Sequence, residues 1–441
     1  MNKKKAVFLF GAGAALDWGG PKTICNGDHL TFLPEHASPD VIKNRICCLT
    51  HLMRETGFKS KNGNRISENI YQKLIKGRLE IDHANFESIF NFIDELFAYY
   101  GDTTKNDFFS FLDFPEDLKD ELFNYIRTEN PVDNSFNLSV PEYEFYKDRL
   151  QEGTIPEQQF AGWLLDDLIK GIHGHISKYS YHTPSHNVIF NEANENNNRL
   201  FCSWMNSLKD EHSIRMYTLN YDRLFKLLLE KDGMEIFEGF IPYNPSIGYF
   251  GRYKADIPRI QNDTESNVYY NLHGCVTWDL EAENVNQLPG YEYYLTIAPV
   301  TRTSSAVIEI EKGKKLLLAN IITGYQKVQR TALAPFRQML SAFDRDCVSA
   351  DEIFIIGYSY ADEHINDIIR NARKYNPAVK ITLINPIFDD EKFMFDFILH
   401  WEELKGRIYD KDGNDIISEQ FNVRAKQMKF SEYLENNYKI T

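Results

Sequence analysis

Cysteine is scarce in this sequence and forms no recognisable pattern. The six cysteines include no Cys-x-x-Cys pair. Cys47 and Cys48 are adjacent in the chain and are poorly placed to form a disulfide with each other. The sequence therefore lacks the paired cysteines of a zinc module, and this usage is typical of proteins kept in a reducing compartment. We expect a cytoplasmic protein with no bound metal.

Long hydrophobic runs are also missing. No apolar stretch approaches the roughly 18–20 residues that cross a bilayer, so we expect no transmembrane helix and no association with a membrane. Lys3, Lys4 and Lys5, followed by the apolar residues 6–16, imitate a signal peptide. Gly11 and Gly13 would break the helix of such a peptide, and the same residues also fit a buried strand followed by a turn.

Positive charge is in deficit, with 49 lysines and arginines against 64 acidic residues and a net charge of −15. Protonating all 12 histidines would still leave the chain negative. Such a protein repels nucleic-acid backbones, so direct binding to nucleic acid is not expected. A local site for one small phosphate ligand remains compatible with this charge.

Several catalytic signatures are absent. The sequence contains neither a Gly-x-Ser-x-Gly elbow nor a P-loop, which excludes the common serine hydrolases and P-loop NTPases. His173, His175, His182 and His186 lie close together in the sequence. Residues two apart on a helix point away from each other, and no cysteine or carboxylate completes a ligand set, so a metal site is not expected here.

The composition is that of a globular protein. Of the 441 residues, 43% are hydrophobic, 26% are charged and 14% are aromatic, which allows a sizeable core. A length of this size fits about three domains, or one large α/β domain with an inserted subdomain.

Five short apolar runs end at glycine or polar clusters, and helix-like periodicity follows most of them. The runs are Lys5–Phe10, Ile214–Leu219, Tyr269–Leu272, Ile353–Ile356 and Lys380–Ile384. Continuous apolar strands that alternate with helices favour a mostly parallel, Rossmann-like α/β sheet with helices on both faces.

The segment between the first two strands is far too long for a single crossover. It contains amphipathic stretches such as Asn85–Tyr100, whose apolar residues recur at helical spacing. We therefore predict a discontinuous α/β domain over residues 1–23 and 199–390, with a helical subdomain inserted at 24–198. Within the insertion, the asparagine-rich run 191–198 has the composition of a surface linker. Residues 391–441 are expected to form a helical tail that packs on the domain.

Polar or glycine residues follow each predicted strand. Gly11, Ala12 and Gly13 form a turn whose backbone amides suit a phosphate, although such a pair of glycines also occurs in plain tight turns. Asn220 and Asp222 follow the second strand and fit either a ligand pocket or a helix N-cap.

His273 and Gly274 follow the third strand. A histidine there suits a general base, and a structural hydrogen-bonding role is the alternative. Gly357 and Ser359 follow the fourth strand and Asn385 the fifth, where they suit phosphate or ribose contacts. All five groups fall at the carboxyl edge of one sheet.

The order of these motifs resembles the sirtuin, or Sir2-like, fold. It is more closely similar to the bacterial sirtuin-like NAD hydrolases of anti-phage defence systems. Asn85-Phe86-Glu87 and the block 357–366, with its Asp362, His364 and Asn366 positions, add to the resemblance, which extends from about residue 6 to 386.

Two departures separate this chain from the sirtuin deacylases. Ala15 stands where those enzymes have a serine, and the Asp-Phe-Arg segment that follows in them is missing. The four-cysteine zinc module beside the catalytic histidine is missing too. The acyl-lysine cleft of that family is therefore in doubt, and water is favoured as the acceptor.

The resemblance implies a role for each matching residue. His273 would deprotonate a ribose hydroxyl or the attacking water, and Asn220 and Asp222 would line the nicotinamide and ribose pocket. The cofactor-binding residues implied are Gly11, Ala12, Gly13, Ala15, Asn85, Glu87, Thr218, Gly274, Gly357, Ser359 and Asn385. Asn85 and Glu87 would close over the pocket, or alternatively form a helix N-cap pair.

We therefore predict an enzyme that cleaves NAD to nicotinamide and ADP-ribose without a metal, as the NAD-depleting effector of an anti-phage system. The resemblance implies control by homo-oligomerisation or by a separate sensor subunit, Argonaute-like or a translocase ATPase. Three alternatives remain: an ADP-ribosyl transferase or deacylase on the same fold, a module that senses NAD or ADP-ribose without turnover, and an assembly subunit.

Overall fold

The computed structural model describes residues 3–19, 169, 173, 176–243, 251–285, 288–300, 306–311, 314–323, 327–386, 410–412, 415–418 and 422–438. Most of the predicted helical insertion, including Asn85 and Glu87, lies outside these residues.

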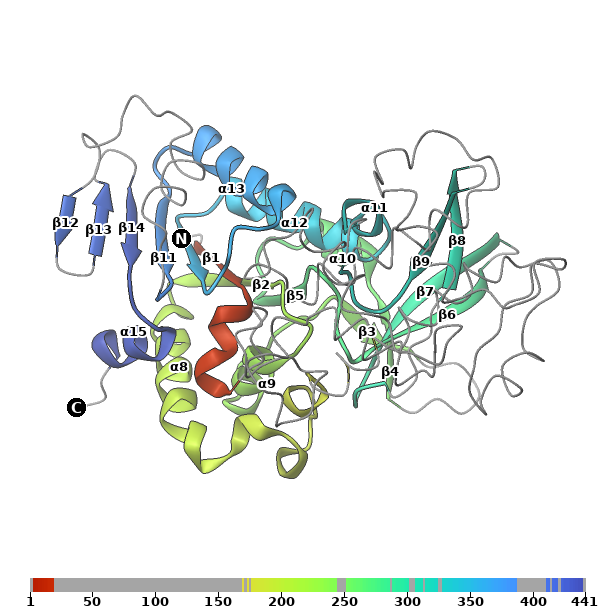
Figure 1. Cartoon of the computed structure of the whole chain (residues 1–441), viewed down its shortest axis with the longest axis horizontal. Coiled ribbons are helices and arrows are strands. Elements are labelled where there is room, and N and C mark those ends of the chain that lie inside the picture. The colour runs from red at the N-terminus through yellow and green to blue at the C-terminus, as the bar shows by residue number, and fades with distance from the viewer. Residues whose placement is uncertain are drawn as a thin grey trace, which may run out of the picture.

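A central eight-stranded sheet organises the described chain (Figure 1), with the order β12-β13-β14-β11-β10-β1-β2-β5. Six neighbouring strands are parallel: β14 (Val423–Lys426), β11 (Lys380–Ile384), β10 (Glu352–Ile356), β1 (Lys4–Phe10), β2 (His212–Thr218) and β5 (Val268–Asn271). Strands β12 (Asp410–Asp412) and β13 (Asp415–Ser418) add an antiparallel edge. The five predicted strands all belong to this sheet, which confirms the Rossmann-like α/β fold.

Strand β1 lies in the middle of the sheet, and its side chains alternate between two apolar clusters. Phe8 and Phe10 pack on one face, against α8 (Glu195–Leu208), α9 (Leu224–Lys231), α15 (Phe430–Asn437) and the 3-10 helix η1 (Ala12–Trp18). Val7 and Leu9 pack on the other face, against α10 (Ile257–Asn262), α12 (Phe336–Val348) and α13 (Glu363–Tyr375). Figure 1 shows these helices on opposite sides of the sheet, as predicted.

A second sheet was not predicted from the sequence. Between α9 and the short helix α11 (Lys327–Thr331), the chain forms β3 (Phe240–Pro242) and β4 (Arg252–Ala255) before β5, and β6 (Trp278–Val285) and β7 (Leu288–Thr296) after it. These four strands form a sheet in the order β3-β4-β7-β6. The hairpin of β8 (Ala306–Glu311) and β9 (Lys314–Leu318) follows. Figure 1 shows these strands at the opposite end of the molecule from β12. Trp278 and Tyr293 bury their rings in the apolar cluster around α12.

Two local expectations are corrected. The run at 191–198 is not a free linker, because residues 195–198 begin α8 and the predicted boundary at 198/199 falls inside that helix. Asn198 accepts a bond from the Trp18 indole N–H at 2.7 Å and donates to the Ile189 carbonyl at 2.8 Å. Short 3-10 turns precede α8: η4 (Ser177–Tyr179), η5 (Pro184–His186), η6 (Val188–Phe190) and η7 (Glu192–Asn194).

The predicted helical tail is the second correction. In the described part of residues 391–441, three strands precede α15, and β14 extends the parallel sheet beside β11. None of the helices in the described ranges combines the length and apolarity needed to cross a membrane.

Candidate active site

The ends of the parallel strands lie level at one edge of the sheet. Phe10, the last residue of β1, is in register with Thr218 of β2 and with Ile356 of β10. Thr218 in turn pairs with Asn271, and Ile356 pairs with Ile384. The residues that follow these positions therefore emerge together, at the edge where open α/β sheets bind ligands. The predicted clustering of the five strand-end motifs is confirmed.

Three glycines let the turns after β1 and β10 touch. The N–H of Gly13 donates to the carbonyl of Gly357 at 2.8 Å. A Cβ on Gly13 would lie 2.8 Å from the Gly357 Cα, and one on Gly11 would lie 2.5 Å from the Gly357 oxygen. Gly357 has φ +59°, and a Cβ there would meet the Ala14 nitrogen at 2.1 Å. Ala15 is buried in the apolar cluster beneath this turn.

Asn220 connects the loop after β2 to the glycine turn. Its Nδ2 donates to the Gly11 carbonyl at 3.1 Å, and its backbone N–H donates to Thr218 Oγ1 at 3.0 Å. Thr218 is fully buried, and its hydroxyl donates to the Phe10 carbonyl. It therefore holds the loop after β2 in place. The Asn220 side chain is only half-buried and stands beside the predicted pyrophosphate turn.

Asp222 lies two residues before the first residue of α9 and bonds to its backbone. Its Oδ1 accepts the Leu224 N–H at 2.9 Å at the start of α9. Burial raises the pKa of this carboxyl to about 6. The pKa of the neighbouring Tyr179 is raised to about 12, mainly by burial and secondarily by the Asp222 charge. Within the described residues, no hydrogen bond joins Asp222 to His273.

Asn271, the last residue of β5, was given no role in the sequence analysis. Its Nδ2 donates to the carbonyls of Asn220 at 3.0 Å and of Asp222 at 2.9 Å. It therefore fixes the loop that presents both predicted residues. The signal for it was a lone amide at the end of an otherwise apolar strand.

His273 is buried, with 2% of its surface exposed. Its Nε2 is enclosed and has no hydrogen-bond partner among the described residues. Burial lowers the pKa of His273 to about 3, and the charge of Lys327 also lowers it, while Asp362 acts to raise it. The imidazole is therefore neutral at neutral pH. Gly274 has φ +82°, and a Cβ there would meet the Asn320 oxygen at 2.1 Å.

A second histidine lies beside His273. His364, in the first turn of α13, has its ring centroid 5.8 Å from that of His273. The adjacent Asp362 forms an ion pair with Lys327 at 2.8 Å. Burial acts to raise the pKa of Asp362, but the ion pair and hydrogen bond with Lys327 hold that pKa below its usual value. In the sequence, Asp362 and His364 stood out only as members of the block 357–366.

The remaining strand-end residues have different surroundings. Ser359 is exposed. Asn385 donates from Nδ2 to the Tyr358 carbonyl at 3.1 Å and so supports the turn that contains Ser359.

His173, from the predicted insertion, lies with its Nε2 2.9 Å from Asn320 Oδ1. In the part of the chain that the structure describes, no group of three or more His, Cys, Asp or Glu residues could hold a metal ion.

Comparisons with known proteins follow the same region. Residues 215–393 match the family model described as the SIR2-like domain. A search of curated proteins found no match. Among solved structures, a Sir2 homologue with a serine-to-alanine mutation, in complex with ADP-ribose, is 11% identical, with a TM-score of 0.36 over 98% of this chain and 90% of that one. A histidine-to-asparagine mutant of a Sir2 homologue, also with ADP-ribose, is 12% identical, with a TM-score of 0.32 over 70% and 83%.

Proposed function

Because the chain contains a SIR2-like domain at residues 215–393, we propose that it is an NAD glycohydrolase that releases nicotinamide and ADP-ribose. The substrate would bind along the carboxyl edge of the sheet, between the turns after β1, β2, β5 and β10. Nicotinamide is a good leaving group because its ring is cationic in NAD and becomes neutral when the glycosidic bond breaks. The reaction therefore needs a hydrogen-bond acceptor, an orienting amide and protection from bulk water.

The observation that supports this proposal most directly is the buried, unpartnered Nε2 of His273 among the described residues. Buried polar atoms are ordinarily paired, so an enclosed nitrogen at a ligand-binding edge suits a group that the substrate supplies. The neutral imidazole has a lone pair available to accept a proton or hydrogen bond. In this role His273 accepts from a ribose hydroxyl or from the attacking water.

The other residues would position the dinucleotide. Gly11, Ala12 and Gly13 would bring backbone close to the pyrophosphate, and the half-buried Asn220 would orient the nicotinamide ribose or carboxamide. Asp222, with a pKa near 6, is mostly ionised above neutral pH and would favour the positive charge that develops on the ribose. Gly357, Ser359 and Asn385 would contact the adenosine half.

Water is the acceptor we propose, because the sequence lacks the four-cysteine module that accompanies the peptide cleft of sirtuin deacylases. We further propose that this activity depletes NAD during anti-phage defence in the cytoplasm. Uncontrolled hydrolysis would be toxic, so the activity would be switched by self-assembly or by a separately encoded sensor subunit.

The test is nicotinamide and ADP-ribose release from NAD by the full chain over a series of protein concentrations. His273→Ala and Asn220→Ala are compared with His186→Ala, which alters an exposed histidine outside the site. We expect His273→Ala to reduce turnover by about 10²–10⁴-fold, as loss of a general base does, with His186→Ala unchanged. A rate per molecule that rises with concentration would indicate activation by assembly.

If instead NAD binds but is not cleaved at any concentration, the isolated chain is not an active hydrolase, which leaves a sensing module or an enzyme that needs its partner subunit. If His273→Ala retains full turnover, the proposed role of His273 is wrong.

A further inference from the structure

The Nε2 atom of His364 is enclosed and, like that of His273, has no hydrogen-bond partner among the described residues. The two rings face each other with centroids 5.8 Å apart and planes inclined by 35°. Buried polar atoms are ordinarily paired, and two unpaired nitrogens on neighbouring rings at the edge where open α/β sheets bind ligands suit a ligand that bonds to both.

The turn before α13 is built to hold His364 in this position. The Tyr358 hydroxyl accepts the Asp362 N–H at 3.2 Å and lies 3.0 Å from Asn366 Oδ1. Asn366 Nδ2 donates to the carbonyl of Tyr360 at 2.9 Å. Tyr360 has φ +59°, in the left-handed region that strains a non-glycine residue. These bonds fix the backbone on both sides of His364.

The surrounding charges indicate what kind of group the two rings take. Burial lowers the pKa of His364, as it does that of His273, and Lys327 adds to this in both cases. Asp362 opposes the shift in both rings, and Asp367 does so for His364. Asp362 is in turn paired with Lys327. Two neutral rings beside a carboxylate offer no net positive charge to a phosphate, whereas they can donate to and accept from hydroxyls.

We propose that His364 binds, together with His273, the vicinal hydroxyls of the ribose that carries nicotinamide. This inference rests on the proposed function, because it takes that ribose as the group lying against His273. It makes His364 a second substrate-contacting residue on α13, across the ligand from the loops of β2 and β5. The adenosine half and the pyrophosphate do not depend on it.

Two ligands separate this contact from the rest of the site. ADP-ribose contains the second ribose, whereas ADP has the same adenosine and pyrophosphate without it. Binding of both is measured by calorimetry to wild type, His364→Phe, His364→Gln and Asn371→Ala. Phe keeps the volume but removes the polar atoms, and Gln restores a polar atom close to the Nε2 position. Asn371→Ala changes an exposed residue on the same helix.

We expect His364→Phe to weaken ADP-ribose binding by about tenfold or more, which corresponds to about 1.4 kcal/mol, and to leave ADP binding unchanged. His364→Gln should recover most of the loss, and Asn371→Ala should match wild type. Circular dichroism confirms that each variant is folded. If His364→Phe does not fold, two other measurements test the ribose contact. They are ADP-ribose binding by His364→Gln compared with wild type, and the difference in affinity between ADP-ribose and ADP in wild type.

Equal ADP-ribose binding by wild type and a folded His364→Phe would overturn the inference, and so would an equal loss for ADP, which would indicate a phosphate contact. Wild type that binds ADP-ribose but does not cleave NAD would leave the ribose contact standing, with the chain either a sensing module or a hydrolase that needs its partner subunit. Wild type that binds neither ligand would overturn both.

Discussion

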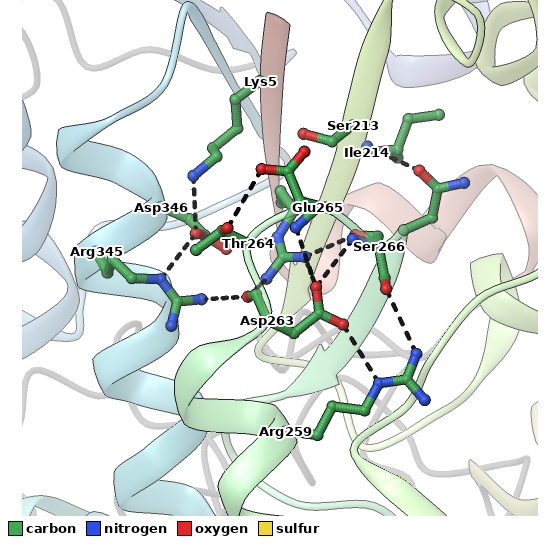
Figure 2. Close-up of polar contacts among 12 residues, drawn as sticks. Lys5, Ser213, Ile214, Arg259, Asp263, Thr264, Glu265, Ser266, Arg345 and Asp346 are labelled. Atoms are coloured by element: carbon green, nitrogen blue, oxygen red, sulfur yellow. Dashed lines mark hydrogen bonds and ion pairs between the residues drawn. The ribbon is translucent and has the colours of Figure 1, made fainter. Parts of the chain in front are cut away.

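Arg215 and Asp346 form a fully buried ion pair between β2 and α12, with Nε 2.6 Å from Oδ2 and neither side chain exposed. Asp346 also accepts bonds from Lys5 at 3.1 Å and from the Tyr217 hydroxyl at 2.5 Å. Figure 2 shows Lys5 and Arg345 converging on Asp346, with Asp263 and Arg259 beyond them. Arg215 uses its other nitrogens on the carbonyls of Ser266 and Asp263. The network joins β1, β2, α12 and the segment from α10 to β5, away from the ligand-binding edge.

We predict that Asp346→Asn destabilises the fold strongly. The substitution leaves Arg215 and Lys5 without their counter-charge, and breaking a buried pair in this way costs roughly 3–5 kcal/mol. Denaturant unfolding at pH 7 measures the loss, with the exposed Asp367→Asn as control. The charge contacts hold the pKa of Asp346 below its usual value of 3.8, so its contribution is present above that pH and is lost as pH falls through the lower folded value. A loss below 1 kcal/mol would contradict this account.

The contact between the glycine turns predicts a sharp difference between two glycines. Gly357→Ala puts a Cβ 2.1 Å from the Ala14 nitrogen, whereas Gly233→Ala, at a similar positive φ of +83°, meets nothing within 4 Å. Gly233→Ala should cost only the backbone strain, about 1–2 kcal/mol. Gly357→Ala should cost more than that, because the turns of β1 and β10 must separate, and NAD binding should fall with it. Thermal unfolding and NAD titration of both variants test this, and equal effects would show that the contact is unimportant.

Asp222→Asn should separate stability from activity. The pKa of about 6 in the folded protein lies above the ordinary 3.8, so the folded state holds its proton more tightly and stability falls as pH rises from about 4 to 6. Asparagine keeps an acceptor for the Leu224 N–H and removes this cost, so we expect a gain of about 1–3 kcal/mol above pH 7 that disappears near pH 4. NAD turnover should fall. Melting temperatures at pH 4, 6 and 8 measure the effect, and a loss of stability at pH 8 would contradict it.

Asn271→Leu should disorder the loop that presents Asn220 and Asp222. The change removes two donors and leaves two buried carbonyls unpaired, at a cost of about 1–3 kcal/mol each. Because the loop carries proposed substrate contacts, we expect NAD affinity to fall more than the loss of stability alone explains. Asn376→Leu is the control for stability. It removes one hydrogen bond, from the side-chain amide at the C-terminal end of α13 to the Ala350 carbonyl. Unchanged NAD affinity in a folded Asn271→Leu protein would show that the loop does not need this support.

The parallel sheet could be predicted because its strands are buried on both faces. Such strands are mostly apolar, so β1, β2, β10 and β11 stand out in the sequence, and the residues after them share an edge. The glycines at 11, 13 and 357 were visible for the same kind of reason, since a Cβ at any of them would lie 2.1–2.8 Å from backbone atoms of the facing turn. The sheet of β3, β4, β6 and β7 was missed because its strands are one-sided and because β4 pairs with β7, which follows β5 and β6 in the chain.

The amino-acid order by itself therefore determined the α/β class and the edge at which chemistry-bearing residues gather, because burial and backbone geometry leave a local trace in composition. The tertiary structure decided which of those residues already have hydrogen-bond partners in the protein and which can bond to a ligand. Asp222 turned out to accept the first N–H of α9 and Asn385 to support a turn, whereas the Nε2 atoms of His273 and His364 are enclosed without a partner in the described part of the chain. Hydrogen-bond pairing across distant segments depends on the folded arrangement, and no spacing rule along one strand or helix contains it.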